Sequence, residues 1–167
     1  MNTLNFTAVV ENYWILEAPA PLPYISLNAL KRVKDPLPKP EACPYCGGSV
    51  KLVNNCEIYG KSIGDWPFAY HCQKCSEAYV GVHPDTDIPV GIMACKKLRK
   101  ARQSAKISFH EMLAATGMER RHGYAWLAKQ LGLSINETHY GWFTLLQCEQ
   151  ALAVTKAETK KCQTPKA

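Results

Sequence analysis

Two Cys-x-x-Cys motifs narrow the folds that this chain can adopt. The motif 43–46 reads Cys-Pro-Tyr-Cys, and after 25 intervening residues the motif 72–75 reads Cys-Gln-Lys-Cys. Each motif can direct two thiolates, and a tight turn of backbone N–H groups, at one side of a tetrahedral ion. The sequence therefore predicts one structural Zn²⁺ per chain, with four ligands: Cys43, Cys46, Cys72 and Cys75.

Other uses of these thiols fit the pattern less well. Four thiolates leave no open position for water, so the site is expected to be structural rather than catalytic. A redox pair is typical of a single Cys-x-x-Cys followed by a helix, whereas iron in the same ligand set is the main chemical alternative. His71 could compete as a ligand, but its side chain should point to the opposite face of the strand from Cys72. We expect three further cysteines to pack as small hydrophobes: Cys56, Cys95 and Cys148.

Hydrophobic patterning changes near residue 89 and predicts a mixed α+β fold. Before it, β-prone runs alternate with turn residues, which indicates two or three short antiparallel strands. The runs are 50–53, 56–59, 67–72 and 78–82. After it, apolar residues recur at steps of three and four, which predicts helices over about 92–113, 119–131 and 144–157. We expect a small antiparallel four-cysteine zinc ribbon packed against about three C-terminal helices.

Composition along the chain predicts four regions. Residues 1–42 are Pro-rich and form an N-terminal arm, expected to pack through Trp14 and to carry a short helix over 27–34 with Ser26 as its N-cap. The zinc ribbon spans 43–82 and the helical half 83–157. The last ten residues, 158–167, are expected to be a disordered tail.

Composition also indicates in which cellular compartment the protein is expected. The chain is 47% apolar and 20% charged, and no run approaches the ~20 apolar residues that a transmembrane helix needs. Residues 18–20 resemble a signal-peptidase site, but the preceding residues contain no Lys or Arg and include Glu11 and Glu17. We therefore expect a cytoplasmic protein in a reducing compartment, which would be the host cytoplasm if a phage encodes it, with no membrane contact.

Positive charge is concentrated in the C-terminal part of the chain. The formal net charge is +6, yet the first 95 residues hold only 7 of the 20 basic side chains and 9 of the 14 acidic ones. Residues 96–106 contain six basic side chains and no acid. On a helix they would form a cationic outer face that can neutralise phosphates. The candidate nucleic-acid-binding residues are Lys96, Lys97, Arg99, Lys100 and Lys106.

The charge run has two other interpretations. It could be a solvated face that only keeps the protein in solution. It could also be neutralised internally by the acidic residues of the ribbon and the loop after it, which are Asp65, Glu77, Asp85 and Asp87.

Aromatic and histidine side chains supply further candidates. Phe68 and Tyr70 share one strand face, where they could stack bases or cover the helices. An acid–base or second-metal centre would need His83, His110 or His139 to meet Asp85 or Asp87, yet no His-x-x-x-His or His-Glu-x-x-His pattern is present.

Several motifs together resemble the zinc-finger-containing proteins of phages and bacteria that are defined by a domain of unknown function. The resemblance covers roughly residues 41–155 and implies a zinc ribbon joined to a helical half. It rests on Cys-Pro-Tyr-Cys-Gly-Gly (43–48), the second Cys-x-x-Cys (72–75), Gly-x-His-Pro (81–84), Pro-x-Gly (89–91), Tyr-Ala-Trp-Leu-Ala (124–128) and His-x-Gly-x-Phe (139–143). Thr138 and Thr144 stand where the family pattern has Cys and Asp, which argues against a metal or catalytic role for the His139 segment.

These observations predict a zinc-ribbon accessory protein, phage-related, that binds nucleic acid or a host nucleic-acid-processing machine through its basic helix. The first alternative is a protein-binding inhibitor or adaptor that contacts a host factor through residues 13–16 of the arm. The second is a hydrolase or nuclease that uses the loop histidines.

Overall fold

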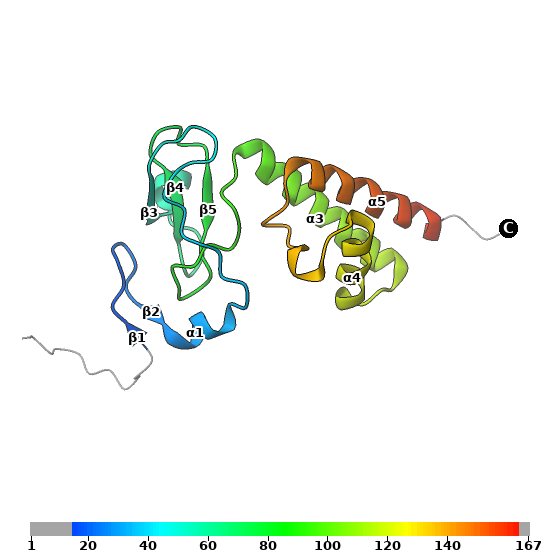
Figure 1. The fold of residues 1–167 in the computed structure, drawn as a ribbon, viewed down its shortest axis with the longest axis horizontal. Helices are drawn as coiled ribbons and strands as arrows, with labels where there is room; N and C mark the ends of the chain where they lie inside the picture. The colour runs from blue at the N-terminus through cyan, green and yellow to red at the C-terminus, as the bar shows by residue number, and fades with distance from the viewer. Residues whose placement is uncertain (1–14, 164–167) are drawn as a thin grey trace, which may run out of the picture.

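A computed structural model describes residues 15–163 and shows a mixed α+β fold in two halves (Figure 1). The N-terminal arm and the ribbon sheet form one half, and a helical unit forms the other. This architecture confirms the predicted α+β class, with small antiparallel sheets followed by three C-terminal helices.

The arm lies beside the ribbon sheet (Figure 1). Strands β1 (Ile15–Leu16) and β2 (Ile25–Ser26) pair antiparallel, and helix α1 (Leu27–Arg32) follows directly. Ser26 is the N-cap, as the sequence predicted, because its Oγ accepts a hydrogen bond from Ala29 N at 3.3 Å. Trp14, the residue predicted to anchor the arm, lies outside the described residues. One anchor within them is Tyr24, whose ring centroid lies 5.1 Å from that of Trp66.

The ribbon is a three-stranded antiparallel sheet in the order β3-β4-β5. Strand β3 (Val50–Asn54) pairs with β4 (Phe68–Cys72), and β4 pairs with β5 (Tyr79–Gly81). The register aligns Val50 with Cys72, which brings the two Cys-x-x-Cys turns to the same end of the sheet. The buried cluster of the ribbon includes Tyr70, Val80, Val82 and Met93.

The helical half has a separate hydrophobic core. Helices α3 (Lys96–Thr116) and α5 (Leu145–Gln163) pack together along much of their lengths, and α4 (Arg120–Leu131) closes the unit (Figure 1). A 3-10 turn, η1 (Ile135–Glu137), joins α4 to the segment before α5. The core of this half contains Phe109, Met112, Leu127, Tyr140, Phe143 and Cys148.

Two predicted helix ends match the structure. Gly132 ends α4 with φ +66°, a left-handed conformation that favours glycine. Before α5, the Thr144 N–H donates to Gln147 Oε1 at 2.8 Å and the Gln147 N–H donates to Thr144 Oγ1 at 3.3 Å, which is the predicted capping box.

Three local predictions are wrong. Residues 56–59, predicted as a strand, form the short helix α2 (Cys56–Tyr59), because Asn54 Oδ1 accepts from the Cys56 N–H and Gly60 ends the turn at φ +75°. Helix α3 begins at Lys96 rather than near residue 92, because Ala94 pairs with Tyr79 of the sheet. Helix α5 continues through 158–163, predicted as disordered tail; residues 164–167 lie outside the described range.

The two halves are joined by a close backbone contact. Gly91 and Gly141 meet so tightly that a Cβ on Gly91 would lie 2.5 Å from the Gly141 carbonyl oxygen. The same oxygen accepts a hydrogen bond from Ile92 N at 2.9 Å. Arg102 of α3 reinforces the contact, since its guanidinium donates to the carbonyl oxygens of Ile92 and Phe143 at 2.8 and 2.9 Å. The relative position of the ribbon and the helices is therefore set by specific contacts.

None of the helices between residues 15 and 163 combines the length and apolar character that crossing a membrane requires.

Replacing Gly91 with alanine should destabilise the protein, because the new methyl group would push Gly141 away and break the Ile92 hydrogen bond. We expect a loss of about 2 kcal/mol or more, which for a chain of this size lowers the melting temperature by roughly 4 °C or more. Gly81→Ala is the matched control, since the nearest atom to its Cβ would be 4.0 Å away. Equal melting temperatures for the two variants in thermal unfolding would contradict this role for Gly91.

Candidate metal centre and basic surface

The four predicted cysteines converge at one end of the ribbon. The ligand atoms of Cys43, Cys46, Cys72 and Cys75 all lie within 4.8 Å of one another. Sulfur separations are 3.9 Å between Cys43 and Cys75 and 3.5 Å between Cys46 and Cys72. Zn–S bonds of about 2.3 Å in a tetrahedron place sulfurs about 3.8 Å apart, so the residues fit the ion. The cluster is consistent with one structural Zn²⁺.

Local sequence explains the first turn of the cluster. The Cys43 N–H donates to the Gly48 carbonyl at 2.8 Å, and the Gly47 N–H donates back to the Cys43 carbonyl at 2.9 Å. Gly47 adopts φ +66°, and Gly48 has no room for a side chain, because its Cβ would lie 2.4 Å from Lys74 Cβ. The Gly-Gly pair after Cys46 thus lets the two turns approach closely enough to share an ion.

The backbone of the second turn donates hydrogen bonds that stabilise a thiolate. The N–H groups of Lys74 and Cys75 both donate to Cys72 Sγ at 3.4 Å. The Cys75 N–H, followed by that of Lys74, lowers the pKa of the Cys72 thiol. Burial raises the pKa of the Cys43 thiol. A bound cation favours the thiolate form of every ligand, so metal binding would release protons from both turns.

His71 is not part of the cluster. Its Nε2 lies 3.1 Å from the carbonyl oxygen of Ser76, in the loop that follows the second turn. The side chain is buried, and its Nδ1 has no hydrogen-bond partner among the described residues. Across residues 15–163, no other group of three or more His, Cys, Asp or Glu side chains has ligand atoms close enough to hold an ion.

The remaining predicted cysteines differ in environment. Cys148 is buried in the helical core, as predicted. Cys56 is exposed on α2, so its predicted role as a packed hydrophobe is wrong. Cys95 is half-buried as the N-cap of α3, where the Leu98 N–H and then the Tyr45 hydroxyl lower its pKa.

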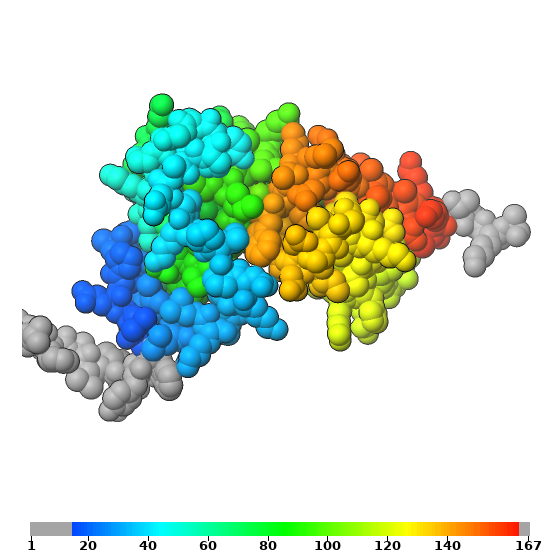
Figure 2. Space-filling view, in the orientation of Figure 1, coloured from blue at the N-terminus to red at the C-terminus, as the bar shows by residue number. Residues whose placement is uncertain are grey.

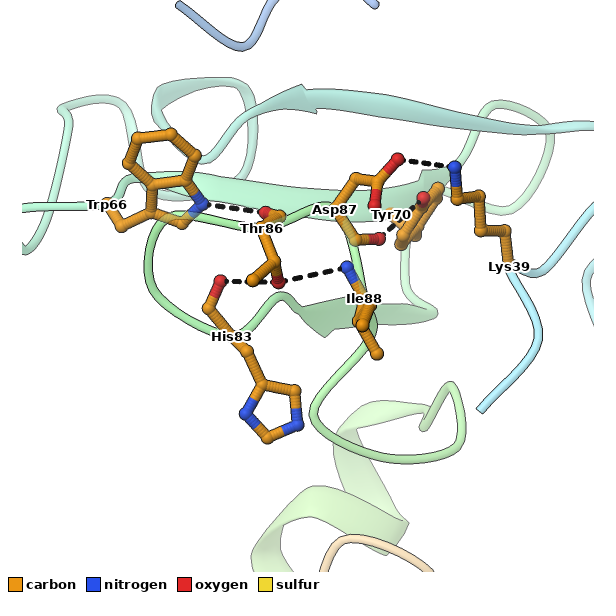
Figure 3. A network of polar contacts seen from close by, with 7 residues as sticks. All are labelled: Lys39, Trp66, Tyr70, His83, Thr86, Asp87 and Ile88. Atoms are coloured by element: carbon orange, nitrogen blue, oxygen red, sulfur yellow. Dashed lines mark hydrogen bonds and ion pairs between the residues drawn. The ribbon is translucent and has the colours of Figure 1, made fainter. Parts of the chain in front are cut away.

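The candidate nucleic-acid-binding residues lie on the first three turns of α3. The side chains of Lys96, Lys97, Lys100 and Lys106 are exposed, and none forms an ion pair with a residue in the described range. The acidic residues of the ribbon and its following loop therefore do not neutralise these lysines. Asp87 instead pairs with Lys39 of the arm (Figure 3).

Arg99 differs from the lysines because it connects α3 to the ribbon. Its guanidinium donates to the carbonyl oxygens of Ala94 and Glu77, the latter at 2.7 Å. It also lies over the Tyr79 ring, 3.6 Å from the ring centroid. Its Nη1 group and one face of its guanidinium are thus used within the protein.

A groove separates the start of α3 from the ribbon. This ribbon–helix groove has a volume of about 660 Å³. Its lining includes Tyr59, Tyr79, Lys96, Arg99, Lys100 and Gln103. The hydroxyls of Tyr59 and Tyr79 are joined by a 2.8 Å hydrogen bond, and Tyr59 is 46% exposed. Periodicity did not reveal this groove, because it forms only where α2, β5 and α3 meet.

The other ribbon aromatics pack inside the protein. Tyr70 is buried and its hydroxyl donates to the Asp87 carbonyl at 2.8 Å (Figure 3). Phe68 packs edge-on against Trp66, with ring centroids 5.0 Å apart. Both side chains therefore pack in the ribbon cluster, so the structure supports neither base stacking nor the predicted alternative that they cover the helices.

Two of the three candidate histidines line one cavity. His83 and His139 both face a space of about 650 Å³ beside α1, together with Asp85. His110 is exposed on α3 and does not line it. Asp87 is also outside the cavity, since it is buried in its pair with Lys39. The three histidines thus do not form one centre.

A comparison with protein families gives one result. The model of a family described as a zinc-finger-containing domain matches residues 39–158, well over half of the chain. The chain therefore belongs to this family of zinc-finger-containing proteins. The match includes all four cysteines, the basic helix and most of α5. Neither the curated proteins nor the solved structures include a significant match.

Replacing Cys72 with serine should remove the metal and unfold the ribbon, because zinc binding of about 10 kcal/mol is also the folding energy of so small a sheet. Cys162→Ser, at the exposed end of α5, is the matched control and should keep its metal. Elemental analysis and circular dichroism measure both effects. A Cys72→Ser protein that retains a full equivalent of metal and an unchanged spectrum would contradict the assignment.

Proposed function

We propose that this zinc-ribbon protein binds nucleic acid in the ribbon–helix groove. It does so either alone or as part of a nucleic-acid-processing machine to which it binds. The observation that supports this most is the combination of unpaired lysines and exposed aromatic surface in one groove. Lys96 and Lys100 are four residues apart and share a helix face, opposite Tyr59 of the ribbon.

The charge at the start of α3 supports an anionic ligand. The N-terminus of a helix carries partial positive charge, so basic side chains in its first turn are unfavourable and anions are favourable. The first turn of α3 has no acidic residue, and three of its first four residues are Lys96, Lys97 and Arg99. A phosphate near this turn would offset that repulsion, so an arrangement that is unfavourable in the free protein becomes favourable in the complex.

The aromatic wall of the groove suits single-stranded nucleic acid. Arg99 covers one face of Tyr79, and the Tyr59 ring meets the Tyr79 ring edge-on at 5.7 Å. Exposed Tyr59 can stack with a base, because every base has a flat face and stacking tolerates any sequence. Binding should therefore depend on phosphate contacts and stacking, with little sequence preference. Within this proposal Lys97 and Lys106 add long-range attraction, and Arg99 holds Tyr79 in place.

A second candidate function is that of an inhibitor or adaptor that binds a protein through the arm. Ile15 and Leu16 support it, because these side chains are 49% and 43% exposed on a two-stranded hairpin. Tyr13 and Trp14, the other residues of that proposed contact, lie outside the described range. A pull-down from nuclease-treated and untreated extract separates the two functions, because only partners bridged by nucleic acid are lost on nuclease treatment.

Replacing Lys100 with glutamine should weaken nucleic-acid binding and lower its dependence on salt. Each phosphate contact contributes a slope of about 0.7 for single strands in a plot of log affinity against log salt concentration. We expect Lys100→Gln to reduce the slope by about that amount and Tyr59→Ala to weaken binding with the slope unchanged. Titrations of single-stranded DNA and RNA at several salt concentrations measure both quantities.

The control for that experiment is Lys156→Gln, because Lys156 is an exposed lysine on α5 outside the groove. It should match the unmodified protein. Absence of salt-sensitive binding to DNA or RNA at low ionic strength, or an equal effect of the two lysine substitutions, would contradict the proposed function.

A further inference from the structure

The cavity beside α1, hereafter the α1 cavity, is built from three segments that are far apart in the sequence. They are the end of α1 with the residues after it, the turn 83–90 after β5, and the segment 139–142 before α5. In Figure 2 the light-blue chain around α1 lies beside the orange segment that precedes α5. The volume of about 650 Å³ is in the range of small-molecule sites.

One wall of the α1 cavity is aromatic. The rings of His139 and Trp142 lie 4.6 Å apart with an interplanar angle of 48°. The backbone N–H of Trp142 donates to the His139 carbonyl at 2.8 Å, so a backbone turn brings the two residues together. Pro89 and Val90 add apolar surface. This wall offers a flat ligand a place to stack.

His83 extends from a rigid turn. The Thr86 hydroxyl donates to the His83 carbonyl at 2.9 Å, and the His83 N–H donates to the Ile88 carbonyl at 2.8 Å. Figure 3 shows the imidazole directed away from this network. No described residue forms a hydrogen bond with the ring, and burial lowers its pKa. A neutral imidazole offers one donor and one acceptor, which suits the edge of a heterocycle.

Charged groups of both signs line the α1 cavity. Arg32 and Lys34 are exposed and form no ion pair with a described residue. Of the two carboxylates, Asp85 is engaged within the protein, because its Oδ1 accepts a hydrogen bond from the Tyr24 hydroxyl at 2.9 Å. Asp35 is exposed. The guanidinium of Arg32 can therefore bind a phosphate oxygen at the α1 side of the cavity.

We propose that the α1 cavity binds a nucleoside 5′-monophosphate, either free or as the 5′ end of a nucleic-acid strand. The base stacks on Trp142, His83 hydrogen bonds to its edge, and Arg32 and Lys34 contact the phosphate. A metal centre does not fit, because no three of the imidazole and carboxylate groups here come within ligand distance of one another. The α1 cavity shares no lining residue with the ribbon–helix groove, so this proposal does not depend on the proposed function.

The test measures binding of the four ribonucleoside 5′-monophosphates by calorimetry, with the nucleosides and inorganic phosphate as partial ligands. We expect at least one monophosphate to bind saturably and more tightly than its nucleoside. Arg32→Gln should weaken it about tenfold, since a charge-assisted hydrogen bond contributes that much. Trp142→Leu should weaken it about fivefold or more by removing stacking.

Matched controls keep the test decisive. Arg121→Gln, at an exposed arginine of α4, is the control for Arg32→Gln. His83→Asn should also weaken binding, and His122→Asn is its control. Zinc content and circular dichroism together report the folding of each variant. Absence of saturable binding by every monophosphate, or equal affinities in Arg32→Gln and Arg121→Gln, would overturn the proposal.

Competition identifies the source of the ligand. Displacement of the mononucleotide by a 5′-phosphorylated oligonucleotide, but not by its 5′-hydroxyl counterpart, supports the end of a strand. Displacement by free nucleotides alone supports a free ligand. Lys100→Gln should leave mononucleotide affinity unchanged, whereas loss of affinity in that variant would place the nucleotide in the ribbon–helix groove and overturn this proposal.

Discussion

Four thiolates that converge at one end of the ribbon allow a single ion to stabilise the whole sheet. A three-stranded sheet with short strands buries too little apolar surface to be stable alone, so an ion that joins its two turns supplies most of its folding energy. The same cluster positions functional surfaces. The second turn continues into β5, which carries Tyr79, and Tyr79 with Arg99 fixes the start of α3 against the ribbon. Loss of the ion would therefore remove the ribbon–helix groove as well as the sheet.

The contact between the two halves depends on two glycines and one arginine. Gly91 and Gly141 let two backbone segments approach, and Arg102 then satisfies the carbonyl groups on either side. Two of the six basic residues in the run 96–106 are thus structural, and the four lysines remain exposed. A basic helix of this kind both joins the halves and presents charge to a ligand.

Sequence predicted the features that depend on local pattern. The spacing of the cysteines identified the cluster, and the residue types around Gly132 and Thr144 identified helix ends, because each depends on neighbours within a few positions.

Long-range contacts determine the features that sequence did not predict. The start of α3 was placed too early because Ala94 pairs with a strand that periodicity does not include. Sequence identifies His83 and His139 as candidates but does not indicate that they share a cavity, since 55 residues separate them and the cavity forms only where both segments meet the end of α1. The glycines in the Pro-x-Gly and His-x-Gly-x-Phe motifs were the available signal, because glycine in a motif indicates a close approach.

X-ray absorption spectroscopy of the purified protein identifies the ion that Cys43, Cys46, Cys72 and Cys75 hold and the atoms that surround it. We expect one zinc per chain and a coordination shell of four sulfurs at about 2.3 Å from the ion. A shell containing nitrogen or oxygen would mean that another residue or water replaces one of the thiolates. That result, an iron edge in place of the zinc edge, or a protein that is fully folded without any metal would contradict a structural four-thiolate zinc site.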